Sequence, residues 1–220
     1  MKNFVKILFI FSLIIIFALP TQAESNWTFE LFGGTGLNIP LPLVIEEDGG
    51  ETIEIDSAHY STKPLDGSPY YAWRVGRWEN NKAWELELVH HKIYLDNEND
   101  RIDNFSISHG YNLITANRAW DNGDFIYRLG AGVVLTHPEF KIDGIKNDQT
   151  KGLGGAGFYL DGVTGQAAIA KQYDLTENIF ATTEAMFTAS YAKVNPDDYD
   201  YTATVPNSAL HLLLGLGYKF

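Results

Sequence analysis

The sequence predicts an all-β protein, an eight-stranded antiparallel transmembrane up-and-down β-barrel. Three observations support this prediction. After residue 23 no stretch approaches the ~20 apolar residues that a membrane-spanning helix needs. Several long segments instead alternate apolar with small or polar side chains and are rich in Tyr, Trp, Val and Ile. The chain also ends on such a segment, "HLLLGLGYKF", although its formal net charge is -12. This alternation is typical of a strand with one face in lipid and one in a barrel lumen.

The first 23 residues have the pattern of a secretory signal peptide. Lys2 and Lys6 supply a positive start, residues 7–19 are almost entirely apolar, and small residues follow before residue 24. The sequence therefore divides into a signal peptide, residues 1–23, and a barrel domain, residues 24–220. The absence of cysteine excludes a lipidated cysteine and a disulfide framework.

The alternating segments and the turn residues between them predict eight strands. They are expected at residues 27–38, 69–78, 83–95, 102–114, 124–137, 158–172, 178–193 and 208–220. The connections after the second, fourth and sixth strands are short and polar ("ENNK", "TANRAWDNGD" and "YDLTEN"), whereas those after the first, fifth and seventh are long. Bacterial outer-membrane barrels have short periplasmic turns and longer outer loops, so both chain ends are expected on the periplasmic side. The connection at residues 97–100 is expected to be a tight outer turn.

The outer loops carry most of the acidic residues. The first, residues 39–68, contains "VIEEDGGETIEI", which predicts a hairpin projecting above the membrane. Such loops could bind divalent cations beside anionic lipopolysaccharide. A solvated, aggregation-resistant surface is the favoured interpretation, because no calcium-loop spacing is present. The sequence therefore predicts no metal site and no cofactor, and it has no phosphate-binding or nucleic-acid-binding motif.

Aromatic residues gather at the predicted periplasmic ends of the strands. An interfacial aromatic girdle requires this placement, and the aromatic core of a soluble β-sandwich, the alternative, would not sort them to one end. The residues are Trp27, Trp78, Trp84, Trp120, Phe125, Tyr173, Phe180, Tyr218 and Phe220.

The last strand carries a recognisable terminal pattern. Gly215, Tyr218 and Phe220 form a Gly-x-x-aromatic-x-aromatic arrangement, which resembles the terminal-strand signal of outer-membrane β-barrel proteins, although Leu213 stands where that signal usually has a polar residue. The architecture is similar to that of small OmpA-like and OmpX-like barrels and of lipid A acyl-modifying enzymes. This resemblance implies location in the bacterial outer membrane, contact with its lipids, including lipopolysaccharide, and recognition by the barrel-assembly machinery. It leaves subfamily and oligomeric state open.

Strand parity predicts a row of charged side chains in the lumen. Arg74, Glu87 and Arg128 face inward at similar depth, and Gly110 is expected to leave space for Arg128 to reach Glu87. An eight-stranded barrel is only wide enough to be filled by side chains, so this row predicts a plug and not a channel. The same parity adds further polar residues that could extend the row, with charges solvated in a wet lumen as the alternative; they are Glu30, Glu85, Gln166 and Glu184.

Histidines with nearby serines are the candidates for chemistry. Counting from the tight turn places His91 opposite Ser106 on the lumen face and His90 opposite Ile107 on the lipid face, and it places His109 on the lipid face. An intramembrane histidine is a functional candidate by default. His91 and Ser106 could form a base and nucleophile pair, but no carboxylate is near enough to orient the imidazole.

A second candidate pair lies in the first long loop. His59 and Ser61, in "HYS", resemble the His-x-Ser element of PagL-type lipid A deacylases, although Thr62 follows where that family has Asn. The function favoured by the sequence is a barrel without a large pore, with a structural or surface-interaction role in the cell envelope. The alternative is a lipid A-modifying enzyme, an acyl ester hydrolase or acyltransferase at the outer leaflet.

Overall fold

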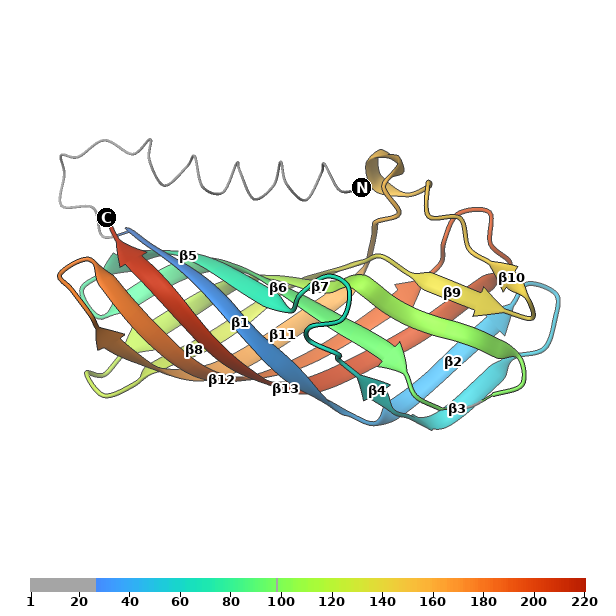
Figure 1. The fold of residues 1–220 in the computed structure, drawn as a ribbon, viewed down its shortest axis with the longest axis horizontal. Helices are drawn as coiled ribbons and strands as arrows, with labels where there is room; N and C mark the ends of the chain where they lie inside the picture. Colours follow the sequence, from blue (N-terminus) through green and yellow to red (C-terminus); the bar gives the residue numbers. More distant parts are fainter. Residues whose placement is uncertain (1–26, 98) are drawn as a thin grey trace.

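A computed structural model describes residues 27–97 and 99–220, so the predicted signal peptide lies outside the described residues. Eight long antiparallel strands form a ring (Figure 1). They are β1 (Trp27–Ile39), β5 (Tyr71–Glu79), β6 (Lys82–Leu95), β7 (Ile102–Asp121), β8 (Ile126–Thr136), β11 (Tyr159–Asp174), β12 (Ile179–Val194) and β13 (Tyr201–Lys219). The ring closes because β1 pairs with β5 on one edge and with β13 on the other, from Thr28 opposite Lys219 to Ile39 opposite Ser208. The predicted eight-stranded barrel is thus confirmed.

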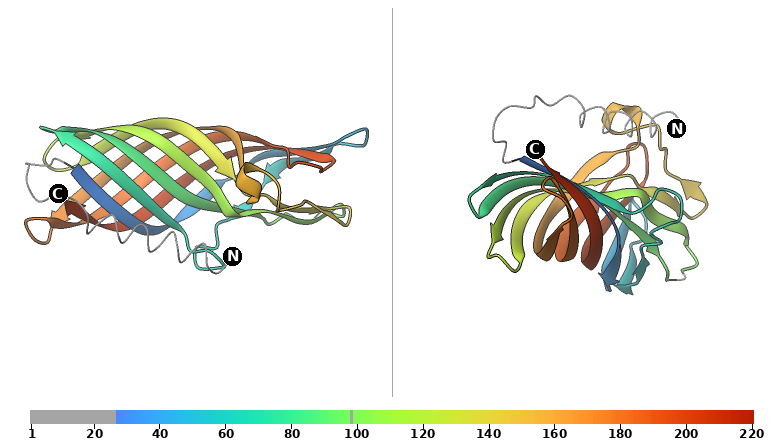
Figure 2. Two further views of the ribbon diagram at one scale, coloured as in Figure 1. Left: turned by 90° about the horizontal axis from the view of Figure 1, so that it is seen from above. Right: turned by 60° about the vertical axis from the view of Figure 1, so that its left-hand side comes forward.

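The two ends of the barrel differ. β1 starts and β13 finishes at one end, which we call the terminal end, where the turns are short. At the opposite, far end the wall continues as additional strands (Figure 1, Figure 2). These are β2 (Leu41–Glu47), β3 (Ile53–Ala58), β4 (Tyr60–Ser61), β9 (Glu139–Ile142) and β10 (Ile145–Lys146). The β2–β3 pair is the hairpin predicted around Gly49, whose φ of 73° suits glycine.

Two predicted strand limits were too short. β7 continues to Asp121 through residues expected to form a turn, because Thr115, Asn117 and Ala119 face the lumen and give the segment a polar appearance. β13 begins at Tyr201 and not at residue 208, since its first residues pair with β12 and with β2. Within the described part of the chain the one helical segment is the short 3-10 turn η1 (Leu153–Gly155), and no helix there is long and apolar enough to cross a membrane.

Side chains alternate between a buried lumen face and an exposed outer face. On β1 the lumen-facing Glu30 is 1% exposed, whereas the neighbouring Leu31 is 48% exposed. The outer face carries exposed apolar side chains around the ring, among them Leu37, Leu86, Leu129, Val163, Leu212, Leu214 and Leu216. Charged residues inside and apolar residues outside are the reverse of a soluble sandwich and match a lipid-facing barrel.

Most of the predicted aromatic girdle is found on the outer face at the terminal end. Exposed members are Trp27, Trp84, Phe125, Tyr173 and Tyr218. The prediction was wrong for two residues, which turn inward and close the lumen at this end. Phe180 is fully buried against Gly217, and Trp78 packs on Ala83, Ala119, Ile126 and Ala170.

Candidate functional site: the lumen and the outer face

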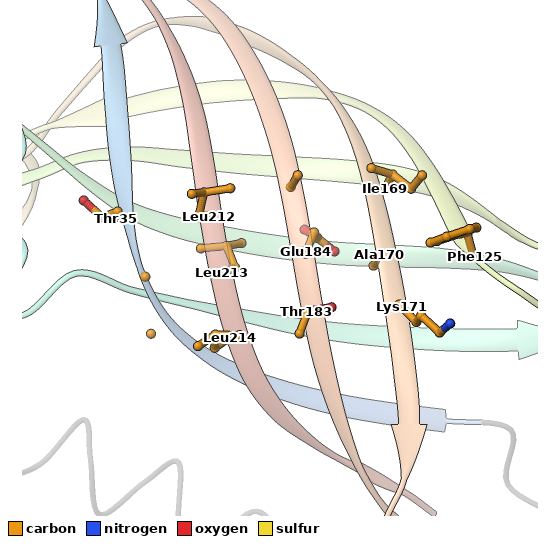
Figure 3. Close-up of a pocket in the computed structure, with 13 residues that line it drawn as sticks. Thr35, Phe125, Ile169, Ala170, Lys171, Thr183, Glu184, Leu212, Leu213 and Leu214 are labelled. Atoms are coloured by element: carbon orange, nitrogen blue, oxygen red, sulfur yellow. The ribbon is translucent and has the colours of Figure 1, made fainter.

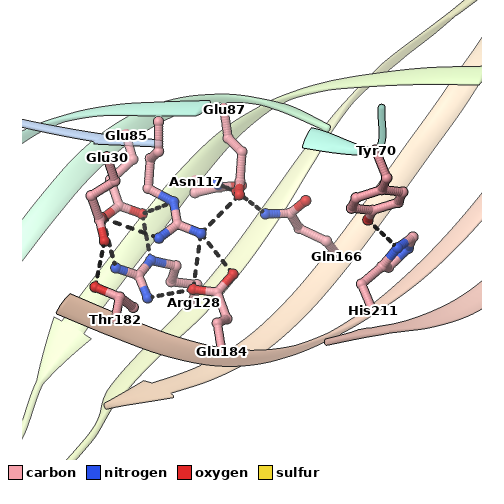
Figure 4. Close-up of polar contacts among 11 residues, drawn as sticks. Glu30, Tyr70, Glu85, Glu87, Asn117, Arg128, Gln166, Thr182, Glu184 and His211 are labelled. Atoms are coloured by element: carbon pink, nitrogen blue, oxygen red, sulfur yellow. Dashed lines mark hydrogen bonds and ion pairs between the residues drawn. The ribbon is translucent and has the colours of Figure 1, made fainter. Parts of the chain in front are cut away.

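Six charged side chains from five different strands meet in the lumen near the terminal end (Figure 4). We call them the lumen charge cluster: Glu30, Arg74, Glu85, Glu87, Arg128 and Glu184. Each is at most 4% exposed. Strand parity sends every second side chain inward, so the six enter the lumen at the same or the adjacent inward position from β1, β5, β6, β8 and β12, with β6 supplying two.

Arg74 is the centre of the cluster. Its Nη2 donates to Glu87 Oε1 at 2.8 Å and to Glu184 Oε1 at 2.7 Å, and its Nη1 donates to Glu30 Oε1 at 3.3 Å. The predicted contact between Arg74 and Glu87 is therefore present, and it follows from their direct cross-strand pairing on β5 and β6.

Arg128 does not bond Glu87, contrary to the sequence prediction. Its Nε donates to Glu85 Oε2 at 2.8 Å and its Nη1 to Glu184 Oε2 at 2.9 Å. Gly110 plays no part in this contact, because it lies in the middle of β7, where its carbonyl accepts from the His137 amide. Partner choice across a lumen depends on stagger around the whole ring, which parity along single strands does not reveal.

Neutral groups complete the hydrogen bonding of the cluster. Glu87 Oε2 accepts from Asn117 Nδ2 at 2.7 Å and from Gln166 Nε2 at 2.6 Å, and Glu30 Oε2 accepts from the Thr182 hydroxyl at 2.8 Å. The cluster thus fills this section of the lumen with satisfied polar groups. Two arginines face four carboxylates, so the arginines hold together a local excess of negative charge.

A second polar layer lies on the far-end side of the lumen charge cluster and was not predicted from the sequence. The Tyr70 hydroxyl hydrogen bonds His211 Nδ1 at 2.7 Å (Figure 4), and His211 Nε2 hydrogen bonds the Thr188 hydroxyl at 2.8 Å. His91 packs edge-on against His211, with ring centroids 5.0 Å apart, and its Nε2 hydrogen bonds Asn38 Oδ1 at 2.9 Å. Inward parity of His91 and His211 was the available signal. Tyr70 has the inward parity of Arg74 within the predicted strand 69–78, although the observed strand β5 begins only at Tyr71.

The predicted register near His91 was wrong. Tyr111 pairs with His91, and Ser106 pairs with Tyr94 on the outer face. The physical reason is a bulge: β6 contributes only Lys92 where β7 contributes residues 108–110, and Gly110 adopts a φ of 133°. His91 is therefore enclosed in the lumen and cannot act on Ser106.

The two predicted lipid-face histidines both lie outside the lumen. His90 stacks on Tyr71 with ring centroids 4.9 Å apart, and its Nδ1 hydrogen bonds Asn112 Oδ1 at 2.8 Å, so it is 5% exposed. His109 Nδ1 lies 2.9 Å from Glu139 Oε1 on β9. The Ser108 hydroxyl donates to the other oxygen of Glu139, and it lies 3.4 Å from His109 Nδ1. The bulge thus brings a serine, a histidine and a carboxylate together on the outer face.

This outer trio lies beyond the apolar band. His109 is about twelve residues from the terminal end of β7, or ~30 Å at ordinary strand rise and tilt, whereas the apolar band of such barrels is ~25 Å tall. Burial opposes ionisation of Glu139, but hydrogen bonds from His109 and Ser108 outweigh it and lower the pKa of this carboxyl to about 2. The same hydrogen bond raises the pKa of His109. Ionised Glu139 and protonated His109 therefore stabilise each other.

The second predicted catalytic pair is not formed. The Ser61 hydroxyl donates to Asp96 Oδ1 at 2.9 Å, and His59 Nε2 lies 3.5 Å from the Ser57 hydroxyl. The sequence predicts that Ser61 lies in a loop, but it belongs to the short strand β4. Neither side chain activates the other.

The terminal pattern has a packing reason. A Cβ on Gly215 would lie 2.3 Å from the ring of the lumen-facing Phe32, so only glycine fits there. Tyr218 packs edge-on against Phe220, with ring centroids 5.0 Å apart, and the Phe220 amide donates to the Trp27 carbonyl at 2.9 Å. The last residues thus complete the barrel seam.

A groove of about 790 Å³ crosses β13, β12 and β11 on the outer face (Figure 3). Its lining includes leucines, an isoleucine and small residues such as Gly33 and Ala185. It supplies apolar surface and no catalytic constellation. Nor does any group of three or more His, Asp or Glu side chains in residues 27–97 and 99–220 have an arrangement that could hold a metal ion.

No family model matches the chain, and no curated protein matches it. Solved structures with a similar fold include outer membrane protein OprG from Pseudomonas aeruginosa, with 14% identity, a TM-score of 0.47, and coverage of 91% of this chain and 99% of that chain. The attachment invasion locus protein Ail of Yersinia pestis has 14% identity, a TM-score of 0.42 and coverage of 90% and 100%. The outer membrane protease OmpT from Escherichia coli has 10% identity, a TM-score of 0.44 and coverage of 92% and 99%. Similarity at this level does not extend to activity.

Proposed function

We propose that the protein is a bacterial outer-membrane β-barrel without a large pore that has a structural or surface-interaction role in the cell envelope. One observation carries the proposal: an apolar outer face surrounds a lumen that the charge cluster fills with buried, hydrogen-bonded side chains. The terminal end faces the periplasm, and the strands at the far end present the outer surface. Its partners are outer-membrane lipids, including lipopolysaccharide, and the assembly machinery, through Gly215, Tyr218 and Phe220.

Conductance and topology test this proposal together. Planar bilayers containing the purified barrel should show no steady large conductance. Protease added to intact cells should cut in the outer segments 148–157 and 195–200 and spare the short turns at Asn80 and Thr176. A steady large conductance would contradict the filled lumen, and cutting confined to the short turns would invert the topology.

A second candidate function, a lipid A acyl hydrolase or acyltransferase, is favoured by the outer trio alone. A serine nucleophile must pass its proton to a base, and Ser108 donates to Glu139, with His109 beside both. The imidazole does not stand between the serine and the carboxylate, which is why this function ranks second. Lipid A from cells with wild-type protein, Ser108→Ala and no protein should be compared by mass spectrometry. An acyl chain lost or moved only with the wild type would establish the enzyme.

A further inference from the structure

One wall strand of the barrel is built in two pieces. β4 and β5 both pair with β6, Ser61 opposite Tyr94 and Tyr71 opposite His90, and residues 62–70 leave the wall between them. We call residues 62–70 the side loop. Figure 2 shows it as the teal segment that projects from the side of the barrel. An interrupted wall strand needs an explanation, because irregular backbone facing lipid is normally excluded.

The side loop leaves the wall near the outer limit of the apolar band. Tyr71 lies eight residues from the terminal end of β5 and Lys92 ten residues from that of β6, or ~20 Å and ~25 Å at ordinary rise and tilt. The band is ~25 Å tall. The loop therefore emerges where the acyl chains of the outer leaflet meet the headgroups.

Several backbone groups of the side loop have hydrogen-bond partners. The ammonium of Lys92, which is fully buried, donates to the carbonyls of Asp66 at 2.5 Å and Ser68 at 2.6 Å. The Tyr70 amide donates to the Pro64 carbonyl at 2.8 Å. Pro64 and a second proline, Pro69, have no N–H to satisfy. These features lower the cost of placing irregular backbone at a lipid boundary.

Both ends of the side loop are fixed. The Thr62 hydroxyl donates to the Gly36 carbonyl at 2.8 Å, and Tyr70 inserts into the lumen, where it bonds His211. Its tip presents one unprotected apolar side chain next to the exposed Asp66: Leu65 is 91% exposed, the highest fraction among the exposed large apolar side chains of the described residues. Lys63 is also exposed, with its ammonium 4.5 Å from the centroid of the Tyr94 ring.

We propose that the side loop inserts into the outer leaflet of the membrane, with Leu65 among the acyl chains and Lys63 at the level of the lipid phosphates. This inference rests on the proposed function, since it requires the barrel to span a membrane. A leucine close in sequence to a lysine suits the boundary between acyl chains and headgroups, because the lysine ammonium can extend to the lipid phosphates. The loop then sets how deep the barrel sits, as an anchor on one side of the wall.

The absence of cysteine allows a direct test. Leu65→Cys, Leu86→Cys and Leu153→Cys each give one site for a nitroxide label in a barrel reconstituted in phosphatidylethanolamine and phosphatidylglycerol vesicles. Collision with oxygen, which concentrates in lipid, is compared with collision with a water-soluble nickel chelate. Leu86 is the lipid-facing control and Leu153 the water-facing control. The label at position 65 should favour oxygen, as at position 86, and a label introduced by Lys63→Cys should be shallower.

The outcomes separate the two proposals. A label at position 65 that behaves like that at 153, while position 86 behaves as lipid-facing, would overturn the side-loop proposal and leave the barrel intact. A water-like label at position 86 would overturn both. Lys92→Met should mobilise the label at position 65, whereas Lys193→Met, at an exposed far-end lysine, should not. An unchanged spectrum in folded Lys92→Met protein would contradict the anchoring of the loop by Lys92.

Discussion

Replacing Arg74 by methionine should be the most damaging single change in the lumen. Arg74 is 1% exposed and lies within 3.7 Å of four carboxylates, those of Glu30, Glu85, Glu87 and Glu184. After the substitution Arg128 still pairs with Glu30, Glu85 and Glu184, but Glu87 loses its ion-pair partner. Removing one partner from a buried ionic group costs ~3–5 kcal/mol, which corresponds to about two to four powers of ten in the unfolding equilibrium constant.

A carboxylate should matter less than an arginine. Glu87→Ala leaves Arg74 with three carboxylates and takes the acceptor from two neutral donors, Asn117 and Gln166. Leaving neutral donors unsatisfied costs ~1–3 kcal/mol. Arg77→Met is the matched control, because Arg77 lies on the same strand and is exposed beside Trp27. A cation–π contact at an exposed site is worth only ~0.5–1 kcal/mol.

Urea unfolding in detergent micelles, followed by tryptophan fluorescence, measures these differences. Heat-modifiable mobility on gels first establishes that each variant is folded. Adding Glu184→Gln to Arg74→Met removes one surplus carboxylate and should recover at least ~1 kcal/mol. A cost of Arg74→Met within ~1 kcal/mol of that of Arg77→Met would refute the reasoning, since it would mean that water solvates the lumen charges.

Three further predictions concern the ends of the barrel. Deleting Phe220 should leave export intact but lower the folded fraction on heat-modifiable gels, because the seam loses its last hydrogen bond. Glu139 has a folded pKa of about 2, below its unfolded pKa of ~4.3. It therefore stabilises the β9–β7 pairing fully at pH values above ~4.3, and this stabilisation is lost as pH falls toward 2. His109 has a raised pKa, so its stabilisation of β9 is fully present below ~6.5 and is lost as pH rises through the folded pKa. Protection of the β9 amides, measured as hydrogen exchange relative to the intrinsic rate at each pH, should therefore be greatest between these limits. Arg101→Ala should speed proteolysis of the β2–β3 and β9–β10 turns, because Arg101 bonds Glu47 and Asp143.

Each of these has a contrary result. Normal folded levels without Phe220 would count against its role in assembly. If Glu139→Gln leaves the hydrogen exchange of β9 unchanged between pH 3 and 6, Glu139 does not stabilise β9 at acidic pH and that part of the second prediction is wrong. Equal proteolysis of Arg101→Ala and the wild type would show that the far-end hairpins hold without Arg101.

The sequence predicted the barrel because period-two alternation is local. It predicted Arg74 beside Glu87 for the same reason, since the short turn at Asn80 fixes their register. It failed at His91, because the bulge that shifts the register lies between residues 108 and 110 and has no signature except Gly110. The sequence analysis also placed Trp78 and Phe180 at the correct end of the barrel but on the wrong face. The parity of these residues along their strands would have indicated the lumen face.

Contacts across the lumen were beyond reach for a different reason. Whether Arg128 meets Glu85 or Glu87 depends on the stagger accumulated around eight strands. Tyr70 fell within the predicted strand 69–78 and has the inward parity of Arg74, but its bond to His211 across the lumen could not be predicted. Nor does the sequence show that residues 62–70 interrupt a wall strand formed by β4 and β5.

The seam between β1 and β13 places the two ends of the barrel chain in hydrogen-bond contact, through the Phe220 amide and the Trp27 carbonyl. A short covalent link could therefore join them, and the chain could be reopened between residues 148 and 157. Such a circular permutant would keep every strand pair while moving the chain end elsewhere. Such a permutant would separate the stability of the barrel from the position of its terminal aromatics. If it refolds in detergent but fails to assemble in cells, the missing requirement is the aromatic pattern at the C-terminus.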